Sequence, residues 1–138
     1  LSFKLKSNSM KLVLLLSSTL FLCSCAHQLV GKWNVDNYET KQVNQAGVAL
    51  RNIGTLTFDR AGTGTKKLDY TVLGIEVKDS LPFVWTWGTN DNFVAIDSGD
   101  SDLTKTWIII ENSKKVQKWK ATDGANTVQI LELTKLKK

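Results

Sequence analysis

The chain has 138 residues, a length that suits one domain and leaves little room for two. Hydrophobic residues make up 42% of the sequence and charged residues 22%, which excludes an intrinsically disordered chain. One proline and nine glycines exclude collagen-like and proline-rich classes, and two cysteines exclude a disulfide-rich scaffold. The single histidine excludes most histidine-based metal sites and leaves a serine–histidine–aspartate triad only one possible base.

The formal charge of +5 is concentrated near the N-terminus. Residues 1–24 contain Lys4, Lys6 and Lys11 and no acidic residue, so the rest of the chain has 15 basic and 13 acidic residues. The remaining net charge of +2 gives no electrostatic reason to expect a nucleic-acid-binding protein.

Residues 1–24 have the pattern of a secretory signal peptide preceded by a few upstream residues. Met10 and Lys11 form a short positive start, and Leu12–Leu22 is an apolar stretch. A stretch of this length is typical of the hydrophobic region of a signal peptide. It is too short for a membrane-spanning helix, which needs about 20 residues. The sequence therefore predicts export from the cytoplasm.

The leader ends in Leu22-Cys23-Ser24-Cys25, which resembles a bacterial lipobox. The resemblance implies that Cys25 is lipidated and becomes the N-terminus of the mature chain. Residues 25–28 would then form a tether and residues 29–138 the folded domain. Cys23 would be removed with the leader, so the mature chain would have no disulfide. Two or three acyl chains would hold the protein firmly at a membrane.

Two other interpretations of the cysteines remain open. One is ordinary secretion with both thiols unmodified, and the other is a zinc site of Cys23, Cys25 and His27, which lacks a fourth ligand.

If Cys25 is lipidated, Ala26 stands where an aspartate marks inner-membrane retention in enterobacterial lipoproteins, and this analogy favours the outer membrane. The next residues lack the acidic run of surface export in Bacteroidetes, so we expect the periplasmic face.

From Leu29 onward, short runs rich in Val, Ile, Thr, Phe and Trp alternate with turn residues, which predicts strands and no long helix. The polar segment Tyr38–Arg51 is consistent with a loop that acts as a lid, a short helix or an extension of the first strands. The eight predicted strands are Leu29–Asn37, Asn52–Asp59, Thr65–Leu73, Phe83–Trp87, Phe93–Asp97, Leu103–Glu111, Lys115–Ala121 and Thr127–Lys135.

Glycine-containing segments such as Arg60–Gly64 and Gly88–Asn92 predict tight hairpin loops between these runs. Loops this short make neighbouring strands antiparallel, because a parallel crossover needs about a dozen residues or more. The sequence therefore predicts an all-β fold, an antiparallel up-and-down meander of about eight strands. Closure into a small barrel would remove the free edges of the sheet.

The alternation of side chains predicts which residues face the barrel interior. Phe83, Trp85 and Trp87 share one face of their strand, and Tyr70 lies on the apolar face of another. Trp107–Ile110 is apolar on both faces, which predicts a strand that is central in the sheet or covered outside by another segment.

The motif Gly31-Lys32-Trp33 resembles the Gly-x-Trp signature on the first strand of a lipocalin barrel. Over about 110 residues, the order of the later motifs is similar to that of the short lipocalin-like domains found on lipoproteins of Bacteroidetes. These later motifs are Gly54–Asp59 with Gly62–Gly64, Phe83–Trp87 and Ile130–Lys135.

The resemblance implies that Gly31 and Trp33 close the base of the barrel. In lipocalins a basic side chain near the C-terminal strand covers this tryptophan. Lys135 is the candidate here for a cation–π contact, since no arginine follows Arg60. The chain is also short for a full lipocalin and has no predicted C-terminal helix. Both departures argue against a large ligand cavity.

Five tryptophans supply large rings for a barrel interior. A small eight-stranded barrel has room for its own side chains or for one small ligand, so the rings could line a cavity or simply fill the barrel. No cofactor is implied. The candidate ligand-binding residues are Tyr70, Phe83, Trp85, Trp87, Trp107 and Trp119.

Two further clusters are interpreted mainly as solvated surface. The acidic loop Asp97–Asp102 offers three carboxylates, but its spacing differs from that of an EF-hand calcium loop, so no metal site is predicted. Lys118 and Lys120 alternate with Trp119 as in single-strand binders, yet an exported protein meets no nucleic acid. Contact of these lysines with anionic lipid or glycan is the alternative.

Catalysis has little support in the sequence. His27 lies two residues from Cys25, and there is no Gly-x-Ser-x-Gly motif or phosphate-binding loop. We therefore expect a non-enzymatic, lipid-anchored envelope protein that binds a small hydrophobic or amphipathic molecule. One alternative is a filled barrel that binds an envelope protein through its loops, as a protease inhibitor or assembly partner does. The other is an enzyme built on a buried carboxylate pair.

Overall fold

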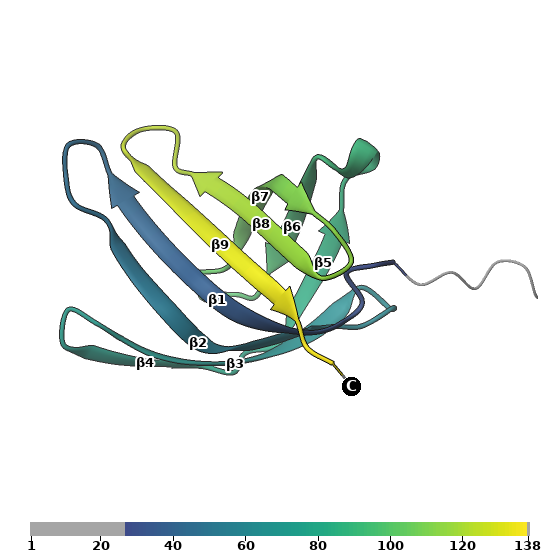
Figure 1. The fold of residues 1–138 in the computed structure, drawn as a ribbon. Helices are drawn as coiled ribbons and strands as arrows, with labels where there is room; N and C mark the ends of the chain where they lie inside the picture. Colours follow the sequence, from purple (N-terminus) through teal and green to yellow (C-terminus); the bar gives the residue numbers. More distant parts are fainter. Residues whose placement is uncertain (1–26, 138) are drawn as a thin grey trace, which may run out of the picture.

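The structure, a computed structural model, describes residues 27–137, and in it nine strands form one antiparallel sheet (Figure 1). A 3-10 turn, η2 (Thr89–Asp91), lies between two of them. The predicted all-β fold is confirmed. The strands are β1 (Gly31–Gln42), β2 (Val48–Phe58), β3 (Thr63–Val72), β4 (Ile75–Asp79), β5 (Phe83–Trp87), β6 (Phe93–Asp97), β7 (Lys105–Asn112), β8 (Val116–Thr122) and β9 (Thr127–Lys135).

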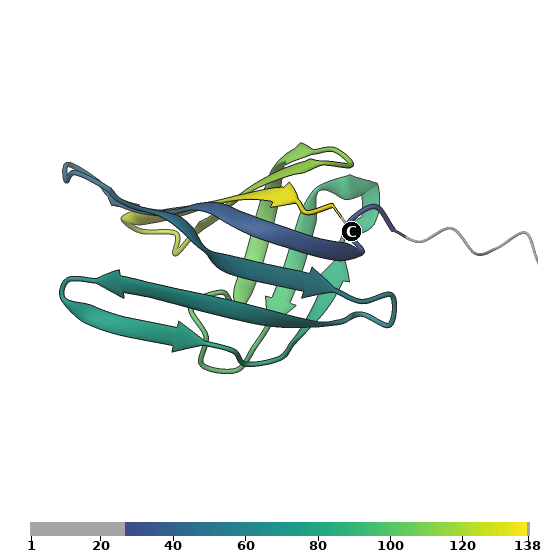
Figure 2. The ribbon, with the colours of Figure 1, turned by 60° about the horizontal axis from the view of Figure 1, so that its bottom comes forward.

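Eight of the nine strands close into a barrel. β1 pairs with both β2 and β9, which joins the two ends of the meander. β3 pairs with β5 through Thr63 and Gly64, and with β4 through Leu68–Val72. β4 therefore lies outside the ring of strands, as one arm of a hairpin that extends beyond the barrel (Figure 2). The closed lipocalin-like barrel matches the prediction, with β4 as an addition.

The sequence does not predict β4, because its turn is unusual. Leu73 and Gly74 form the two-residue connection, with φ angles of 51° and 79°. Two positive φ angles are typical of a type I′ hairpin, whose sequence signal is Asn-Gly or Asp-Gly. Leucine is rare at positive φ, so the first turn position gives no hint of the hairpin.

The segment Tyr38–Arg51 extends the first two strands, which is one of the three interpretations that the sequence allowed. β1 continues to Gln42 and β2 begins at Val48, and the two strands pair as far as Thr40 opposite Val48. The long β1–β2 hairpin forms one wall at the end of the barrel that lies away from the N-terminal segment, residues 27–30 (Figure 1).

An irregularity in β1 changes which of its side chains face the interior. The register with both neighbouring strands shifts between Val35 and Asn37. A β-bulge of this kind inserts one residue and so reverses the alternation beyond it. Trp33 and Val35 are buried before the shift, and Tyr38 faces inward after it.

Aromatic rings fill the half of the barrel nearest the N-terminal segment. Phe58 contacts Phe83, Trp85 and Trp119 edge-on, with ring centroids 5.1, 5.6 and 6.1 Å away. Trp107 packs beside Trp119, with centroids 6.5 Å apart. Each such pair adds about 0.5–1.5 kcal/mol to the stabilisation from burying its area.

Trp33 and Lys135 close the base of the barrel. They are opposite each other in the β1–β9 pairing, and Lys135 Nζ lies 5.3 Å from the Trp33 ring centroid. The same ammonium donates to the main-chain oxygen of Gln28 at 2.9 Å, and Trp33 Nε1 donates to that of Leu29 at 2.7 Å. Gly31 makes this possible, since a Cβ there would approach Lys135 Cε to 2.9 Å. The contact that the lipocalin resemblance implies is thus present.

The outer face of β7 is open to solvent. β7 is central in the sheet, between β6 and β8, as one of the two predictions for Trp107–Ile110 requires. Ile108 and Ile110 are about half exposed, at 50% and 55%, and no segment of residues 27–137 covers them. On the same outer surface, Lys118 forms an ion pair with Glu132 at 3.3 Å.

Residues 27–137 contain no helix that is long and apolar enough to cross a membrane.

Gly54→Ala is expected to destabilise the barrel far more than Gly124→Ala. Gly54 has a φ of +143°, and a Cβ there would lie 1.9 Å from the main-chain oxygen of Lys67 on β3. Relief requires β2 to move away from β3, so we expect a loss of more than about 3 kcal/mol.

Gly124 is the matched control, because its φ is +81° and nothing lies within 4 Å of the added Cβ. Alanine there is expected to cost about 1–2 kcal/mol for the backbone conformation alone. Urea unfolding of both variants measures the difference, and equal losses would contradict the close approach of β2 and β3.

Candidate functional site

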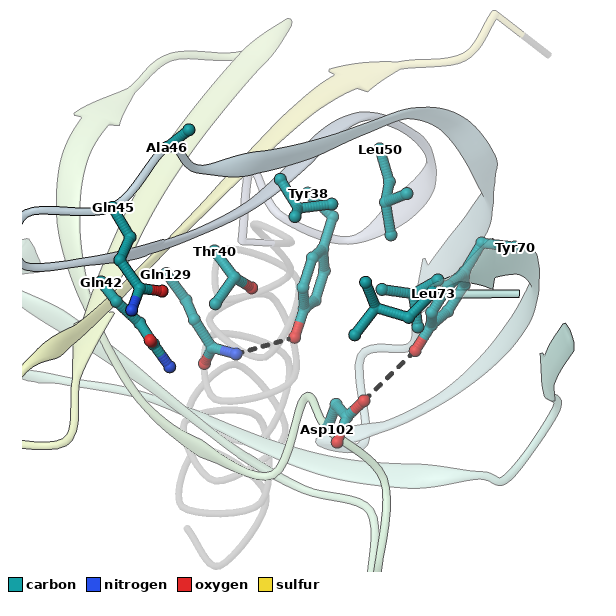
Figure 3. Close-up of a pocket in the computed structure, with 12 residues that line it drawn as sticks. Tyr38, Thr40, Gln42, Gln45, Ala46, Leu50, Tyr70, Leu73, Asp102 and Gln129 are labelled. Atoms are coloured by element: carbon teal, nitrogen blue, oxygen red, sulfur yellow. Dashed lines mark hydrogen bonds between the residues drawn. The ribbon is translucent and has the colours of Figure 1, made fainter. Parts of the chain in front are cut away.

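A cavity of about 470 Å³ (Figure 3) opens at the end of the barrel opposite residues 27–30 (Figure 1). The long β1–β2 hairpin, the β3–β4 turn, the β6–β7 loop and the start of β9 contribute its walls. The lining residues are Tyr38, Thr40, Gln42, Gln45, Ala46, Val48, Leu50, Tyr70, Val72, Leu73, Asp102 and Gln129.

Of the six candidate ligand-binding residues, Tyr70 alone lines this cavity. Phe83, Trp85, Trp107 and Trp119 are buried together in the filled half of the barrel. Trp87 is partly buried at the base of the barrel, which is its closed end, and its ring packs against His27 with centroids 4.5 Å apart. The interior is therefore divided, with packed rings in one half and a cavity in the other.

Sequence reasoning missed most of the lining residues. Tyr38, Thr40 and Gln42 belong to a segment whose structure the sequence left open, and the bulge in β1 hides their inward direction. Gln129 is a polar residue on the inward face of β9, a position that a hydrophobic pattern passes over. The sequence signal that could have found Tyr38, Thr40 and Gln42 is their period of two along the strand, which places all three on one face.

A chain of hydrogen bonds orients the hydroxyl of Tyr38. Lys105 donates to Gln129 Oε1. Gln129 Nε2 donates to the Tyr38 hydroxyl at 3.0 Å (Figure 3). Because the Tyr38 oxygen accepts this hydrogen bond, its own proton is directed elsewhere. Among the described residues it has no acceptor, so it can be donated to a molecule in the cavity.

Tyr38 and Tyr70 lie side by side in the cavity, with centroids 6.3 Å apart and ring planes 20° from parallel. Tyr70 donates to Asp102 Oδ2 at 3.3 Å (Figure 3). Burial and the negative charge of Asp102 raise the pKa of Tyr70 to about 12 and also raise the pKa of Tyr38. Both phenols are therefore neutral donors at physiological pH.

A buried lysine holds the β6–β7 loop at the mouth of the cavity. Lys66 faces inward on β3 and is 2% exposed. Its ammonium donates to Asp79 Oδ1 at 2.8 Å, to the main-chain oxygen of Leu81 at 2.8 Å, and to Ser98 Oγ. Ser101 donates to Asp79 Oδ2 at 2.5 Å. The loop is thus tied to the β3–β4 hairpin at two points.

The acidic segment Asp97–Asp102 belongs to this loop, and Asp102 at its end lines the cavity. Within residues 27–137, no three or more His, Cys, Asp or Glu side chains are grouped so that they could hold a metal ion.

Ser98 and Lys66 have the residue types of a serine–lysine nucleophile pair, but their contacts are structural. The Ser98 hydroxyl donates to the main-chain oxygen of Pro82 at 3.0 Å and is 4% exposed. All three protons of the Lys66 ammonium have acceptors, so its nitrogen is not placed to accept the serine proton.

His27 lies at the closed end, far from the cavity in the fold. It packs against Trp87 and Trp85, and its burial lowers its pKa, with the charge of Asp91 opposing the shift. Together with Gln28, which bonds to Asn112 and Lys135, it packs against the barrel base. Cys23, Cys25 and the rest of residues 1–26 lie outside the described residues.

No protein-family model and no curated protein matches this chain. The lipocalin-like barrel is established by the strand pairing alone, and membership of a lipoprotein family stays a prediction.

Asp79→Asn is expected to lower the free energy of unfolding at pH 7 by about 3 kcal/mol, because it leaves the buried Lys66 ammonium without its counter-charge. Burial alone would raise the pKa of Asp79, but hydrogen bonds from Lys66, Ser101 and the Leu81 amide outweigh it and hold that pKa below 3.8. A folded-state pKa below the unfolded value gives stability that is present above the unfolded pKa and is lost as the pH falls through the folded pKa.

The loss caused by Asp79→Asn should therefore shrink as the pH is lowered from 6 toward 3. Urea unfolding at several pH values measures it. Asp100→Asn, an exposed position in the β6–β7 loop, is the control and should match the wild type. A loss that stays constant over this pH range would show that the carboxylate charge has no role.

Proposed function

We propose that this protein binds a small hydrophobic or amphipathic molecule, without catalysing a reaction, in the cavity at the open end of its barrel. The observation that carries the proposal is a cavity of about 470 Å³ with apolar walls and a few convergent polar groups. Concave sites of this size and composition are typical of small-molecule binding. An eight-stranded barrel has room for one such ligand.

The apolar part of a ligand would contact Val48, Leu50, Val72 and Leu73. Burying apolar surface is worth about 25 cal/mol per Å², before the cost of immobilising the ligand. Leu73, in the β3–β4 turn beside the cavity, supports a role for this turn in ligand binding, since its side chain is 90% exposed and its backbone is held at positive φ. An exposed, strained leucine beside a cavity gains burial when a ligand covers it.

Val72→Trp is expected to weaken binding of decanol, a neutral amphiphile, by about tenfold or more, because the indole would occupy the cavity. Isothermal titration calorimetry of residues 26–138, which contain the whole closed sheet, should give a wild-type dissociation constant of about 10–100 μM.

Thr71→Trp is the matched control. Thr71 is the neighbouring residue on β3 and faces outward, so the same ring would lie on the other side of the sheet. This variant should bind decanol as the wild type does. A folded wild type that binds no decanol would contradict the proposed function.

A second candidate, a barrel that binds an envelope protein through its surface, is favoured by one observation. Half of the interior is filled, while Val84, Ile108 and Ile110 are exposed on the outer face of the sheet. Failure of the folded protein to bind decanol in the calorimetric titration would favour this candidate.

We also propose that the protein is anchored by lipid at Cys25, at the periplasmic face of the outer membrane. The support is the lipobox resemblance at Leu22–Cys25. His27, two residues later, packs at the closed end of the barrel. An anchor at Cys25 would therefore attach at the base, and the cavity would open at the opposite end (Figure 1).

Cys25→Ser is expected to abolish incorporation of radiolabelled palmitate and to release the protein from the membrane fraction of a Gram-negative host. Cys23→Ser should leave both unchanged, because the predicted cleavage removes Cys23. Acylation that survives Cys25→Ser would contradict the assignment of this cysteine.

A further inference from the structure

We propose that the cavity prefers amphipathic ligands with a cationic amine head, and that Asp102 determines this preference. The inference rests on the proposed function and assigns a chemical class to its ligand. It follows from the charge, the aromatic faces and the rigidity of the polar side of the cavity.

Asp102 is the only charged residue among the twelve that line the cavity. One of its carboxylate oxygens accepts the hydrogen bond from Tyr70, and the other has no hydrogen-bond partner among residues 27–137. A positively charged donor in the cavity would pair with this carboxylate. A ligand carboxylate would instead meet a like charge, which is unfavourable.

The charge of Lys105 interacts with that of Asp102, but Lys105 is not among the residues that line the cavity. Lys105 directs its ammonium to Gln129 Oε1 and lines a separate depression with Ala121, Asp123 and Thr127. Gln129 lies between this depression and the cavity, since it lines both. Lys105 also holds Gln129, and through it the Tyr38 hydroxyl, in a fixed orientation.

Two tyrosine rings lie beside Asp102. Tyr38 and Tyr70 are nearly parallel, and their neutral phenols leave π faces that attract a cation. Aromatic faces combined with a carboxylate are the chemistry by which proteins recognise ammonium groups. The apolar walls at Leu50 and Val72 would hold the tail of the same molecule.

The polar side of this site is held in place before a ligand arrives. The buried ion pair of Lys66 and Asp79, with Ser98 and Ser101, fixes the loop that carries Asp102. A ligand therefore does not have to order the loop, which reduces the entropic cost of binding.

Three probes with the same ten-carbon chain test the proposal: decylamine, decanol and decanoate. Each is titrated calorimetrically at pH 7 and low salt, below its micelle concentration, into residues 26–138. We expect decylamine to bind roughly three- to fivefold more tightly than decanol, and decanoate to bind most weakly, as suits a partly solvated ion pair. High salt should reduce the preference for the amine.

Asp102→Asn should bring the ratio of the decylamine affinity to the decanol affinity close to one, because the change removes the charge and keeps the shape of the side chain. Asp100→Asn removes the same charge from the same loop but lies outside the cavity, so it should keep the preference. Circular dichroism confirms that each variant is folded.

Each outcome separates the inference from the proposed function. Equal binding of the three probes, or tighter binding of decanoate, overturns the preference and leaves ligand binding in place. A preference that survives Asp102→Asn overturns the role of this residue. Failure of all three probes to bind the folded wild type overturns both proposals.

Discussion

The edge-to-face packing around Phe58 governs how the interior of this barrel is used. Phe58 on β2 contacts rings from β5 and β8, so one side chain joins strands from different sides of the barrel. An eight-stranded barrel is just wide enough for its own side chains to fill it. Here the large rings gather in the half near the base, and smaller or polar residues line the other half. The cavity exists because the rings are distributed unevenly along the barrel axis.

A charged residue lies between these two halves. Lys66 alternates with Leu68 and Tyr70 on the inward face of β3, where an unpaired ammonium would be strongly destabilising. Asp79, on the paired strand β4, supplies its counter-charge, and main-chain and serine oxygens complete its hydrogen bonds. The extra strand β4 is therefore more than an appendage. It carries the carboxylate that allows a lysine inside the barrel and connects the sheet to the loop that carries Asp102.

The fold was largely predictable, because alternation and short turns determine neighbouring antiparallel strands. Phe83–Trp87, Phe93–Asp97 and Thr127–Lys135 are predicted to the residue. The site was less predictable. A period of two tells which face of a strand a ring occupies, but not how deep in the barrel it lies. The sequence therefore leaves open whether the tryptophans line a cavity or fill the barrel, and in the structure Trp85, Trp107 and Trp119 fill it. The bulge near Asn37 and the positive φ of Leu73 leave no clear mark in one sequence.

The position of β4 outside the ring leaves the outer edge of this strand unpaired in the described sheet. Free main-chain N–H and C=O groups on such an edge can template the addition of another chain, which leads to edge-to-edge association. Two properties of β4 oppose this. It has only five residues, and Glu76 and Lys78 place opposite charges along it, 3.5 Å apart at their closest. A short, charged border thus lets the barrel keep an accessory strand at its mouth while discouraging polymerisation through it.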